Sequence, residues 1–189
     1  MTGTATIVSS ASETRFILHY KVEFFIICLC QPPIIFPINK GTHKALNRFR
    51  GFAYKAGKNN TRTCWVLKCD IRKFFASINH EILIKILKEY IPDQNIIWLL
   101  EEIIGSFSSL PAVALAKEGL LIGLPLGNLT SQLLVNIYMN KLDQFVKHKL
   151  KAKYYIRYAD DFVILSENKD WLEKILSQIR KFLSEELAL

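Results

Sequence analysis

The sequence predicts an α+β fold in which a small antiparallel sheet packs against helices. Residues 63–71 carry the side-chain period of two that is typical of a strand. Residues 154–165 contain two runs rich in β-branched and aromatic side chains on either side of a short turn, which indicates a hairpin. Amphipathic helical patterns lie between and after these strands, so the order is strand, helices, helix, hairpin and helix.

The first elements can be placed from residue 41 onward. A helix with basic residues on one side is expected over 42–54, and the segment Gly57-Lys58-Asn59-Asn60 is expected to form a turn. In the strand that follows, side chains alternate between two faces, so one face carries Val66, Lys68 and Asp70 and the other carries Trp65, Leu67 and Cys69. Asp70 therefore stands at the end of this strand.

Two helices are expected after the strand. Asn79 is the expected N-cap of a helix that runs to Tyr90. Pro92 separates it from a second helix with six aliphatic residues, which are Ile96, Ile97, Leu99, Leu100, Ile103 and Ile104.

A loop and two further helices complete the expected order. The loop over 119–127 contains two internal turn-forming residues, Gly123 and Pro125. A long helix follows, capped by Asn128 or Thr130 and extending to residue 150; its inward side chains are expected to be Leu133, Leu134, Ile137, Leu142 and Phe145. The last helix is expected over about 169–187, after the hairpin.

Composition limits the class of protein. The chain has 189 residues, half of them apolar, which suits one globular domain. Lys and Arg outnumber Asp and Glu by 25 to 17, and the net charge of +8 fits a polyanionic partner such as nucleic acid. The cysteines lack zinc-site spacing and are expected to be reduced core thiols of a cytoplasmic protein; they are Cys28, Cys30, Cys64 and Cys69. The apolar stretch 24–30 is too short to span a membrane, so no membrane role is expected.

The hairpin turn carries two adjacent carboxylates, Asp160 and Asp161. Two like charges this close resist ionisation unless a cation lies between them, and a hard divalent cation with oxygen ligands resolves the repulsion. Asp70 at the end of the other strand supplies a third carboxylate. Three carboxylates from neighbouring strands could hold two Mg²⁺ ions, which phosphoryl transfer requires. The alternative interpretation is a solvated Asp-Asp turn, with Asp70 as a helix cap or surface acid.

Three segments resemble motifs A, B and C of reverse transcriptases, in the family's order and spacing. They are Asp70-Ile71-Arg72-Lys73-Phe74-Phe75, Gly123-Leu124-Pro125-Leu126-Gly127-Asn128-Leu129-Thr130-Ser131-Gln132 and Tyr158-Ala159-Asp160-Asp161. The resemblance covers residues 40–189. It implies a right-hand polymerase palm with incomplete fingers and no thumb, and an RNA-directed DNA polymerase of a bacterial retroelement that adds dNTPs to a DNA primer on an RNA template.

The resemblance also implies roles for particular residues. Asp70 and Asp160 would be the principal ligands of two Mg²⁺ ions, or of Mn²⁺, with Asp161 beside them and the Ile71 carbonyl as a further ligand. Phe75 aligns with the steric gate that excludes the 2′-hydroxyl of a ribonucleotide; the alternative is that its ring packs in the core. The remaining substrate-binding positions implied are Arg72, Leu126, Gly127 and Tyr158. Lys40 and Lys44 either face phosphates or lie on a solvated helix face.

Motif B suggests a subgroup. The residues Leu126-Gly127 and Ser131-Gln132 resemble reverse transcriptases of diversity-generating retroelements more than the Q-G-x-x-x-S-P of group II intron and retron enzymes. In that setting the resemblance implies error-prone copying at template adenines and a small basic accessory protein as a partner. Leu126 replaces a glutamine that contacts template or primer, and would loosen the nascent base pair.

Two departures from the family limit these expectations. Residues 1–39 do not resemble its fingers region and receive no assignment, and the chain ends at Leu189, before motif D, the primer grip and the thumb. The chain is therefore expected to be truncated and to have little or no polymerase activity. The alternative function is an inactive remnant that at most binds RNA. An RNA-dependent RNA polymerase is disfavoured, because it would carry Gly-Asp-Asp at the hairpin and a smaller gate than Phe75.

Overall fold

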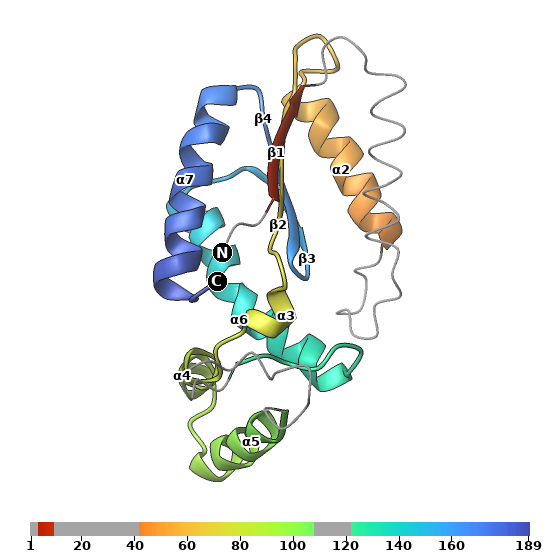
Figure 1. Ribbon diagram of the computed structural model, residues 1–189. Coiled ribbons are helices and arrows are strands. Elements are labelled where there is room, and N and C mark those ends of the chain that lie inside the picture. The colour runs from red at the N-terminus through yellow and green to blue at the C-terminus, as the bar shows by residue number, and fades with distance from the viewer. Residues whose placement is uncertain (1–3, 10–41, 108–121) are drawn as a thin grey trace.

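A computed structural model describes residues 4–9, 42–107 and 122–189 (Figure 1). Its centre is a four-stranded antiparallel sheet in the order β1-β2-β4-β3. The strands are β1 (Thr4–Ser9), β2 (Trp65–Asp70), β3 (Tyr154–Tyr158) and β4 (Asp161–Ser166). The predicted α+β class, the strand that ends at Asp70 and the later hairpin are confirmed.

Helices cover both faces of this sheet (Figure 1). Helix α2 (Thr42–Ala56) packs on one face through Phe49 and Ala56, which share a small core with β3 and β4. Helices α6 (Leu129–Gln144) and α7 (Lys169–Glu186) pack on the other face and enclose the main core. The two faces of β2 divide as expected, because Leu67 and Cys69 enter the main core while Val66 packs against the smaller one.

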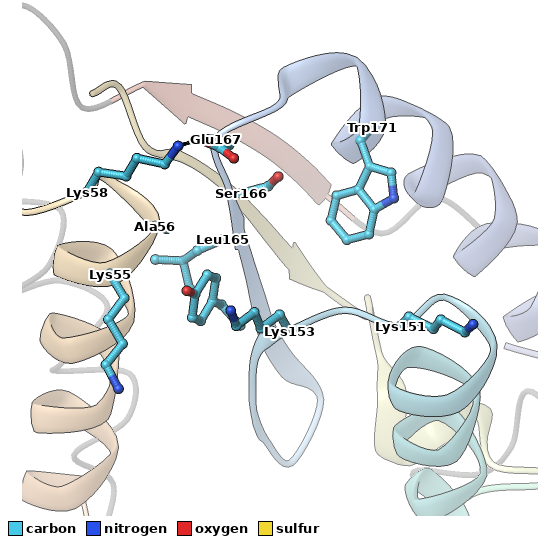
Figure 2. Close-up of a pocket in the computed structure, with 10 residues that line it drawn as sticks. Lys55, Ala56, Lys58, Lys151, Lys153, Leu165, Ser166, Glu167 and Trp171 are labelled. Atoms are coloured by element: carbon cyan, nitrogen blue, oxygen red, sulfur yellow. Dashed lines mark ion pairs between the residues drawn. The ribbon is translucent and has the colours of Figure 1, made fainter. Parts of the chain in front are cut away.

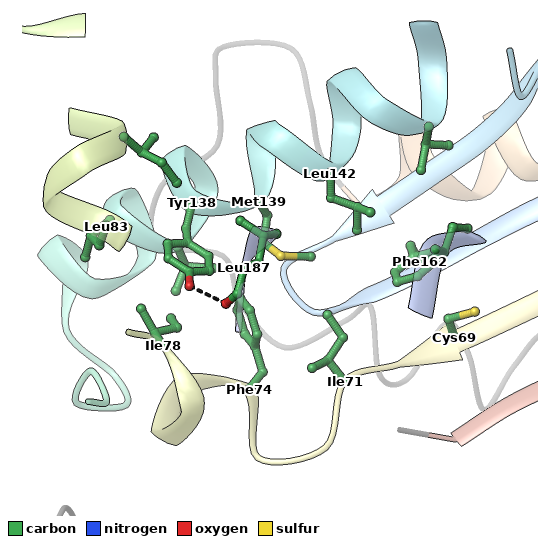
Figure 3. Close-up of a cluster of buried hydrophobic side chains, with 14 of the residues drawn as sticks. Cys69, Ile71, Phe74, Ile78, Leu83, Tyr138, Met139, Leu142, Phe162 and Leu187 are labelled. Atoms are coloured by element: carbon green, nitrogen blue, oxygen red, sulfur yellow. Dashed lines mark hydrogen bonds between the residues drawn. The ribbon is translucent and has the colours of Figure 1, made fainter. Parts of the chain in front are cut away.

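The main core ties the sheet to the C-terminal residues (Figure 3). Phe74, Tyr138 and Phe162 are among its largest fully buried side chains. The Tyr138 hydroxyl donates a 2.6 Å hydrogen bond to the carbonyl of Leu187, which satisfies a polar atom that would otherwise be costly to bury. Helix α6 is thereby linked to the end of α7 (Figure 3).

The expected helices form, with their caps. Helix α4 (His80–Tyr90) begins after Asn79, whose side chain accepts a hydrogen bond of 3.1 Å from the Ile82 amide. Helix α5 (Gln94–Ser106) follows, capped by Asp93, and a short helix α3 (Phe74–Ser77) lies between β2 and α4. Asn128, rather than Thr130, caps α6. The turn expected at 57–60 is present.

Helix α6 differs from expectation in two ways. Leu133 was expected to face inward but is 48% exposed. The buried stripe consists instead of Ser131, Leu134, Val135, Tyr138, Met139 and Leu142, and consecutive helical residues differ in direction by about 100°, so Leu133 lies off the stripe. The helix also does not continue unchanged to residue 150, because Phe145–Lys149 form a π-helical turn, η4, in which Phe145 stacks on Phe182 at 4.2 Å between ring centroids.

Strand β1 was not expected. It pairs along β2 from Thr4 opposite Asp70 to Ser9 opposite Trp65, and so forms an edge of the sheet. Its sequence is Thr-Ala-Thr-Ile-Val-Ser, and the β-branched Thr, Ile and Val were the signal that could have predicted it. Part of the segment that received no assignment therefore belongs to the same sheet as the aspartates.

Several expectations lie outside the described residues. These concern Lys40, Cys28, Cys30, the apolar stretch 24–30, the loop residues 119–121 and the side chain of Lys44. Cys64 and Cys69 are buried and not joined in a disulfide, as expected of reduced core thiols. Among the described helices, none has the length and apolar character needed to cross a membrane.

Candidate active site

The strand pairing brings the three aspartates to one end of the sheet. Asp70 is the last residue of β2, Asp161 is the first residue of β4, and Asp160 lies in the turn just before it. Cys69 pairs with Phe162, so one further step in the same register sets Asp70 opposite Asp161. Residues opposite each other on antiparallel strands point to the same face and lie within contact distance.

Their electrostatic environment reflects this proximity. The pKa of Asp160 is raised to about 6, chiefly by burial and also by the charges of Asp161 and Asp70, against the lowering effect of a backbone hydrogen bond. Burial also raises the pKa of Asp161, where Lys68 lowers it and Asp70 raises it. Asp70 acts on both neighbours, so the three carboxylates form one repelling cluster.

The donor set fits a hard divalent cation, although it is not preassembled. All three aspartates are partly buried and offer oxygen ligands, the type that Mg²⁺ prefers. Within the described residues, no three His, Cys, Asp or Glu side chains already enclose a point where a metal would lie. A cation bound between the carboxylates would relieve their mutual repulsion, and this relief would favour its binding.

The turn that carries Asp160 is held by a buried ion pair that the sequence analysis missed. Ala159 has a φ of 49°, in the left-handed region, and Arg157 donates from Nη1 to the Ala159 carbonyl at 3.0 Å. The same guanidinium donates to both carboxylate oxygens of Asp143 in α6, at 2.8 and 2.7 Å. Tyr155 adds a hydrogen bond of 2.7 Å to Asp143, and Asn136 accepts one from Arg157 at 3.4 Å. The turn is thus braced against α6.

Most of this brace is shielded from solvent. The Arg157 and Asp143 side chains are only 10% and 20% exposed. Burial tends to lower the pKa of Arg157, but the hydrogen bonds and charge of Asp143 outweigh it and raise that pKa. The pKa of the Tyr155 hydroxyl rises well above its ordinary value, chiefly through burial and then through Asp143. A charged residue inside an otherwise apolar strand was the signal that could have revealed the pair.

The side chains of the segment after β2, residues 71–75, differ in how far they are buried. Ile71 is buried, Arg72 is exposed, and Lys73 has a φ of 52°, which turns the chain into α3. Phe74 is fully buried. Phe75 is only partly buried; its ring packs edge-on against Phe74 at 5.6 Å between centroids. Part of the Phe75 side chain is therefore exposed, five residues after Asp70.

The loop before α6 is fastened to this segment by backbone hydrogen bonds. The amide of Leu124 donates to the Phe75 carbonyl at 2.7 Å, and the amide of Gly123 donates to Ile78 at 2.8 Å. The buried His80 ring lies with Nε2 2.6 Å from the Gly123 carbonyl and therefore donates its N–H there. Burial lowers the pKa of His80, which favours the neutral ring. Gly123 has a φ of 95°, a conformation that suits glycine.

The remaining predicted substrate-binding residues have different surroundings. Leu126 is 78% exposed, and Gly127, with a φ of 82°, is also exposed at the start of α6. Tyr158 is partly buried and pairs with Asp161 in the hairpin. The structure thus joins the segment after Asp70 to the loop of Leu126 and Gly127, and places the Asp160 turn against the middle of α6.

Comparison with known protein families shows to which family this chain belongs. Residues 24–188 match the family model described as reverse transcriptase (RNA-dependent DNA polymerase). The chain belongs to the reverse transcriptase family. The predicted recognition is confirmed, and the matched region begins before the residue 40 expected from the three motifs. This reverse transcriptase domain is of RNA-directed DNA polymerase lineage, a family that works on nucleic acids and nucleotides with divalent metal ions.

Relatives of this reverse transcriptase domain include proteins encoded in introns. A putative COX1/OXI3 intron 2 protein of Saccharomyces cerevisiae is 31% identical over 102 residues, which is 51% of this chain and 11% of that protein. An uncharacterized 91 kDa protein in a cob intron of Schizosaccharomyces pombe is 33% identical over 99 residues, 50% of this chain and 11% of that protein. The protein YkfC of Escherichia coli is 26% identical over 162 residues, 68% of this chain and 42% of YkfC. This reverse transcriptase domain thus spans less than half the length of each.

The first prediction concerns charge repulsion in the metal-free protein. Because the pKa of Asp160 is about 6 rather than 3.8, the folded state holds this proton more tightly than the unfolded state does. Ionisation of Asp160 therefore destabilises the fold, fully above about pH 6 and not at all below the ordinary pKa. Asp160→Asn should raise the free energy of unfolding at neutral pH by about 1 kcal/mol, after allowance for solvent screening.

Urea unfolding in the presence of a chelator, at a series of pH values, measures this gain. The matched control is Asp170→Asn, because Asp170 is exposed in the first turn of α7 and should give no gain. A gain for Asp160→Asn that stays constant on acidification would contradict the assigned repulsion.

The second prediction concerns the brace. Arg157→Met should lower the free energy of unfolding by about 3–5 kcal/mol, because it leaves a largely buried Asp143 without its cation. The double variant Arg157→Met/Asp143→Leu should lose less than Arg157→Met alone, since neither charge then stays buried. Urea unfolding of the single and double variants gives the coupling energy. Additive losses would show that the two side chains do not act as a pair.

Proposed function

We propose that this domain catalyses RNA-directed DNA synthesis, in which dNTPs are added to a DNA primer on an RNA template. The clustering of Asp70, Asp160 and Asp161 at one end of the β2–β4 pair, in a chain of the reverse transcriptase family, is the observation that carries this proposal. Two Mg²⁺ ions, or Mn²⁺, would be held by the three carboxylates and the carbonyl of Ile71. When bound, such ions activate the primer hydroxyl and neutralise the leaving pyrophosphate.

The protein's part in this reaction is positioning. Phosphoryl transfer leaves little covalent chemistry to side chains, so the placement of reacting groups and charges supplies most of the rate. Arg157 and Asp143 hold the turn that presents Asp160, and the β2–β4 register holds Asp70 beside Asp161. These contacts fix the carboxylates on strands and a braced turn rather than on a free loop.

We assign the sugar side of the nucleotide to Phe75. Its ring is only partly buried, and its backbone carbonyl binds the loop before α6, which fixes its position. An aromatic ring beside the sugar would clash with a 2′-hydroxyl and so select dNTPs. Arg72 and Tyr158 are proposed to contact the incoming nucleotide, and the exposed Leu126 and Gly127 to contact the template or primer.

Finer features of the proposal rest on motif resemblance. The sequence Leu126-Gly127 supports a diversity-generating subgroup of bacterial origin, with a basic accessory protein as a partner, whereas the relatives described above include intron proteins. We assign the palm with part of the fingers to residues 40–189. Strand β1 adds residues from the preceding segment to the same sheet.

The decisive test is Asp160→Asn in a chain restored with fingers and thumb, assayed by extension of a primed RNA template with labelled dNTPs. Loss of one metal ligand should lower the extension rate by at least about 100-fold, a loss comparable to that of one transition-state contact. Mg²⁺ should raise the melting temperature of the wild type but not of the variant, because binding to the folded state alone stabilises it. Asp170→Asn, at an exposed position, is the control. Undiminished extension by the Asp160→Asn variant would refute the metal role.

A further prediction addresses the proposed gate. Phe75→Ala should raise the kcat/KM for a ribonucleotide relative to that for the matching dNTP by about 10-fold or more, because the clash with the 2′-hydroxyl is removed. Phe75→Tyr keeps the ring and should keep the ratio. An unchanged ratio for Phe75→Ala would assign this ring to core packing alone.

A further inference from the structure

A second charged site lies at the end of the sheet opposite to the aspartates. A cavity of about 420 Å³ opens where β3 begins at Tyr154 and β4 ends at Ser166 (Figure 2). Because strands advance by about 3.4 Å per residue, this cavity is roughly 15 Å from the Asp160 turn. It is therefore separate from the proposed catalytic site.

Lysines dominate the charge around this cavity. Lys55 and Lys58 approach from the α2 side, and Lys151 and Lys153 come from the segment that leads into β3 (Figure 2). Glu167 is the single acidic residue among those that line it. Four lysines against one glutamate give this cavity a net charge of +3 when all are ionised.

The glutamate does not neutralise this charge. Its carboxylate is shared by Lys58 at 3.5 Å and by Arg62 at 3.7 Å, so it is already balanced by more than one cation. Within the described residues, Lys55 and Lys153 form no ion pair, and both are exposed. Lys153 lies 5.4 Å from the centre of the Tyr154 ring. Among the described residues, the cavity therefore presents two lysines without an acidic partner, one of them beside an aromatic ring.

Two aromatic side chains also line this cavity. Tyr154 of β3 lines the cavity, and so does Trp171 of α7, which Figure 2 shows on the side away from α2. Lysines that track a phosphate backbone, together with aromatic rings on which bases can stack, are the combination used by proteins that bind nucleic-acid strands. An acidic peptide would use the lysines but has no need of the rings.

We propose that this cavity binds the phosphodiester backbone of RNA at a point remote from the catalytic carboxylates. The choice of RNA rests on the proposed function, since the template is the RNA that such a domain would hold. The site would give a template or its flanking structure a second attachment to the palm. Each phosphate that a lysine neutralises should add about 0.7 to 0.9 to the slope of log affinity against log salt concentration.

The test compares two double variants of the full chain that remove the same charge. Lys55→Gln/Lys153→Gln removes two exposed lysines of the cavity. Lys85→Gln/Lys181→Gln removes two exposed lysines of α4 and α7 that do not line it. Affinity for a labelled RNA is measured over a range of salt concentrations, with a single strand in one arm and a duplex of equal length in the other. Melting temperatures verify that all variants fold.

The cavity variant should reduce the salt slope by between about 1 and 2, while the control variant leaves it nearly unchanged. The arm with the larger reduction shows whether a single strand or a duplex occupies the site. An unchanged slope, or equal reductions for both variants, would overturn the proposal. Competition by polyglutamate as effective as that by RNA of equal charge would also overturn it in favour of an acidic protein.

Failure of this inference can be told apart from failure of the proposed function. The Asp160→Asn variant should show the same slope reduction when Lys55 and Lys153 are replaced, because the cavity does not depend on the carboxylates. A chain that extends no primer yet shows the reduction would retain this RNA site without polymerase activity. If the chain extends primers but the cavity variant has the same salt slope as the unsubstituted chain, the RNA site at the cavity is refuted and the proposed function stands.

Discussion

The antiparallel pairing of β2 with β4 is the constraint on which the rest of the site depends. The two strands carry Asp70 and Asp161 at adjacent ends only because Cys69 lies opposite Phe162. A slip of one residue would turn Asp70 to the other face of the sheet and expose Leu67, which is fully buried. The hydrophobic cores on the two faces therefore fix the register, and the register fixes the carboxylates.

The second requirement is that the hairpin turn stays still while it carries repelling charges. A left-handed conformation at Ala159 is unfavourable for a residue with a side chain, and adjacent carboxylates add electrostatic strain. Arg157 holds the turn in this conformation, because it binds the Ala159 carbonyl and is itself held by Asp143. A largely buried ion pair carries the cost of removing two charges from water. In return, its hydrogen bonds hold both the position and the orientation of the turn.

Much of this architecture could be predicted from the sequence, because local patterns determine it. The period of two in β2, the caps at Asn79 and Asn128 and the flanks of the Asp-Asp turn each depend on residues close in sequence. The motif resemblance then placed Asp70 with Asp160. Features that depend on distant partners were missed, such as the bond between Arg157 and Asp143 and the pairing of β1 with β2.

The error at Leu133 has the same origin. Both Leu133 and Leu134 fit an amphipathic helix, and only the position of the sheet decides which of them is buried. The cavity beside Tyr154 was also beyond local patterns, because its lysines come from segments almost a hundred residues apart along the chain. The net charge of +8 had indicated a polyanionic partner, but not where on the protein it would bind.

The sheet separates two opposite charges along the length of its strands. Three carboxylates mark one end of the β2–β4 pair, and four lysines surround the other. Within the described residues, this sheet therefore has a carboxylate end and a lysine end, and the lysine end would attract an approaching polyanion. First encounters with nucleic acid would favour the lysine end, and any cation bound at the aspartates would weaken this preference.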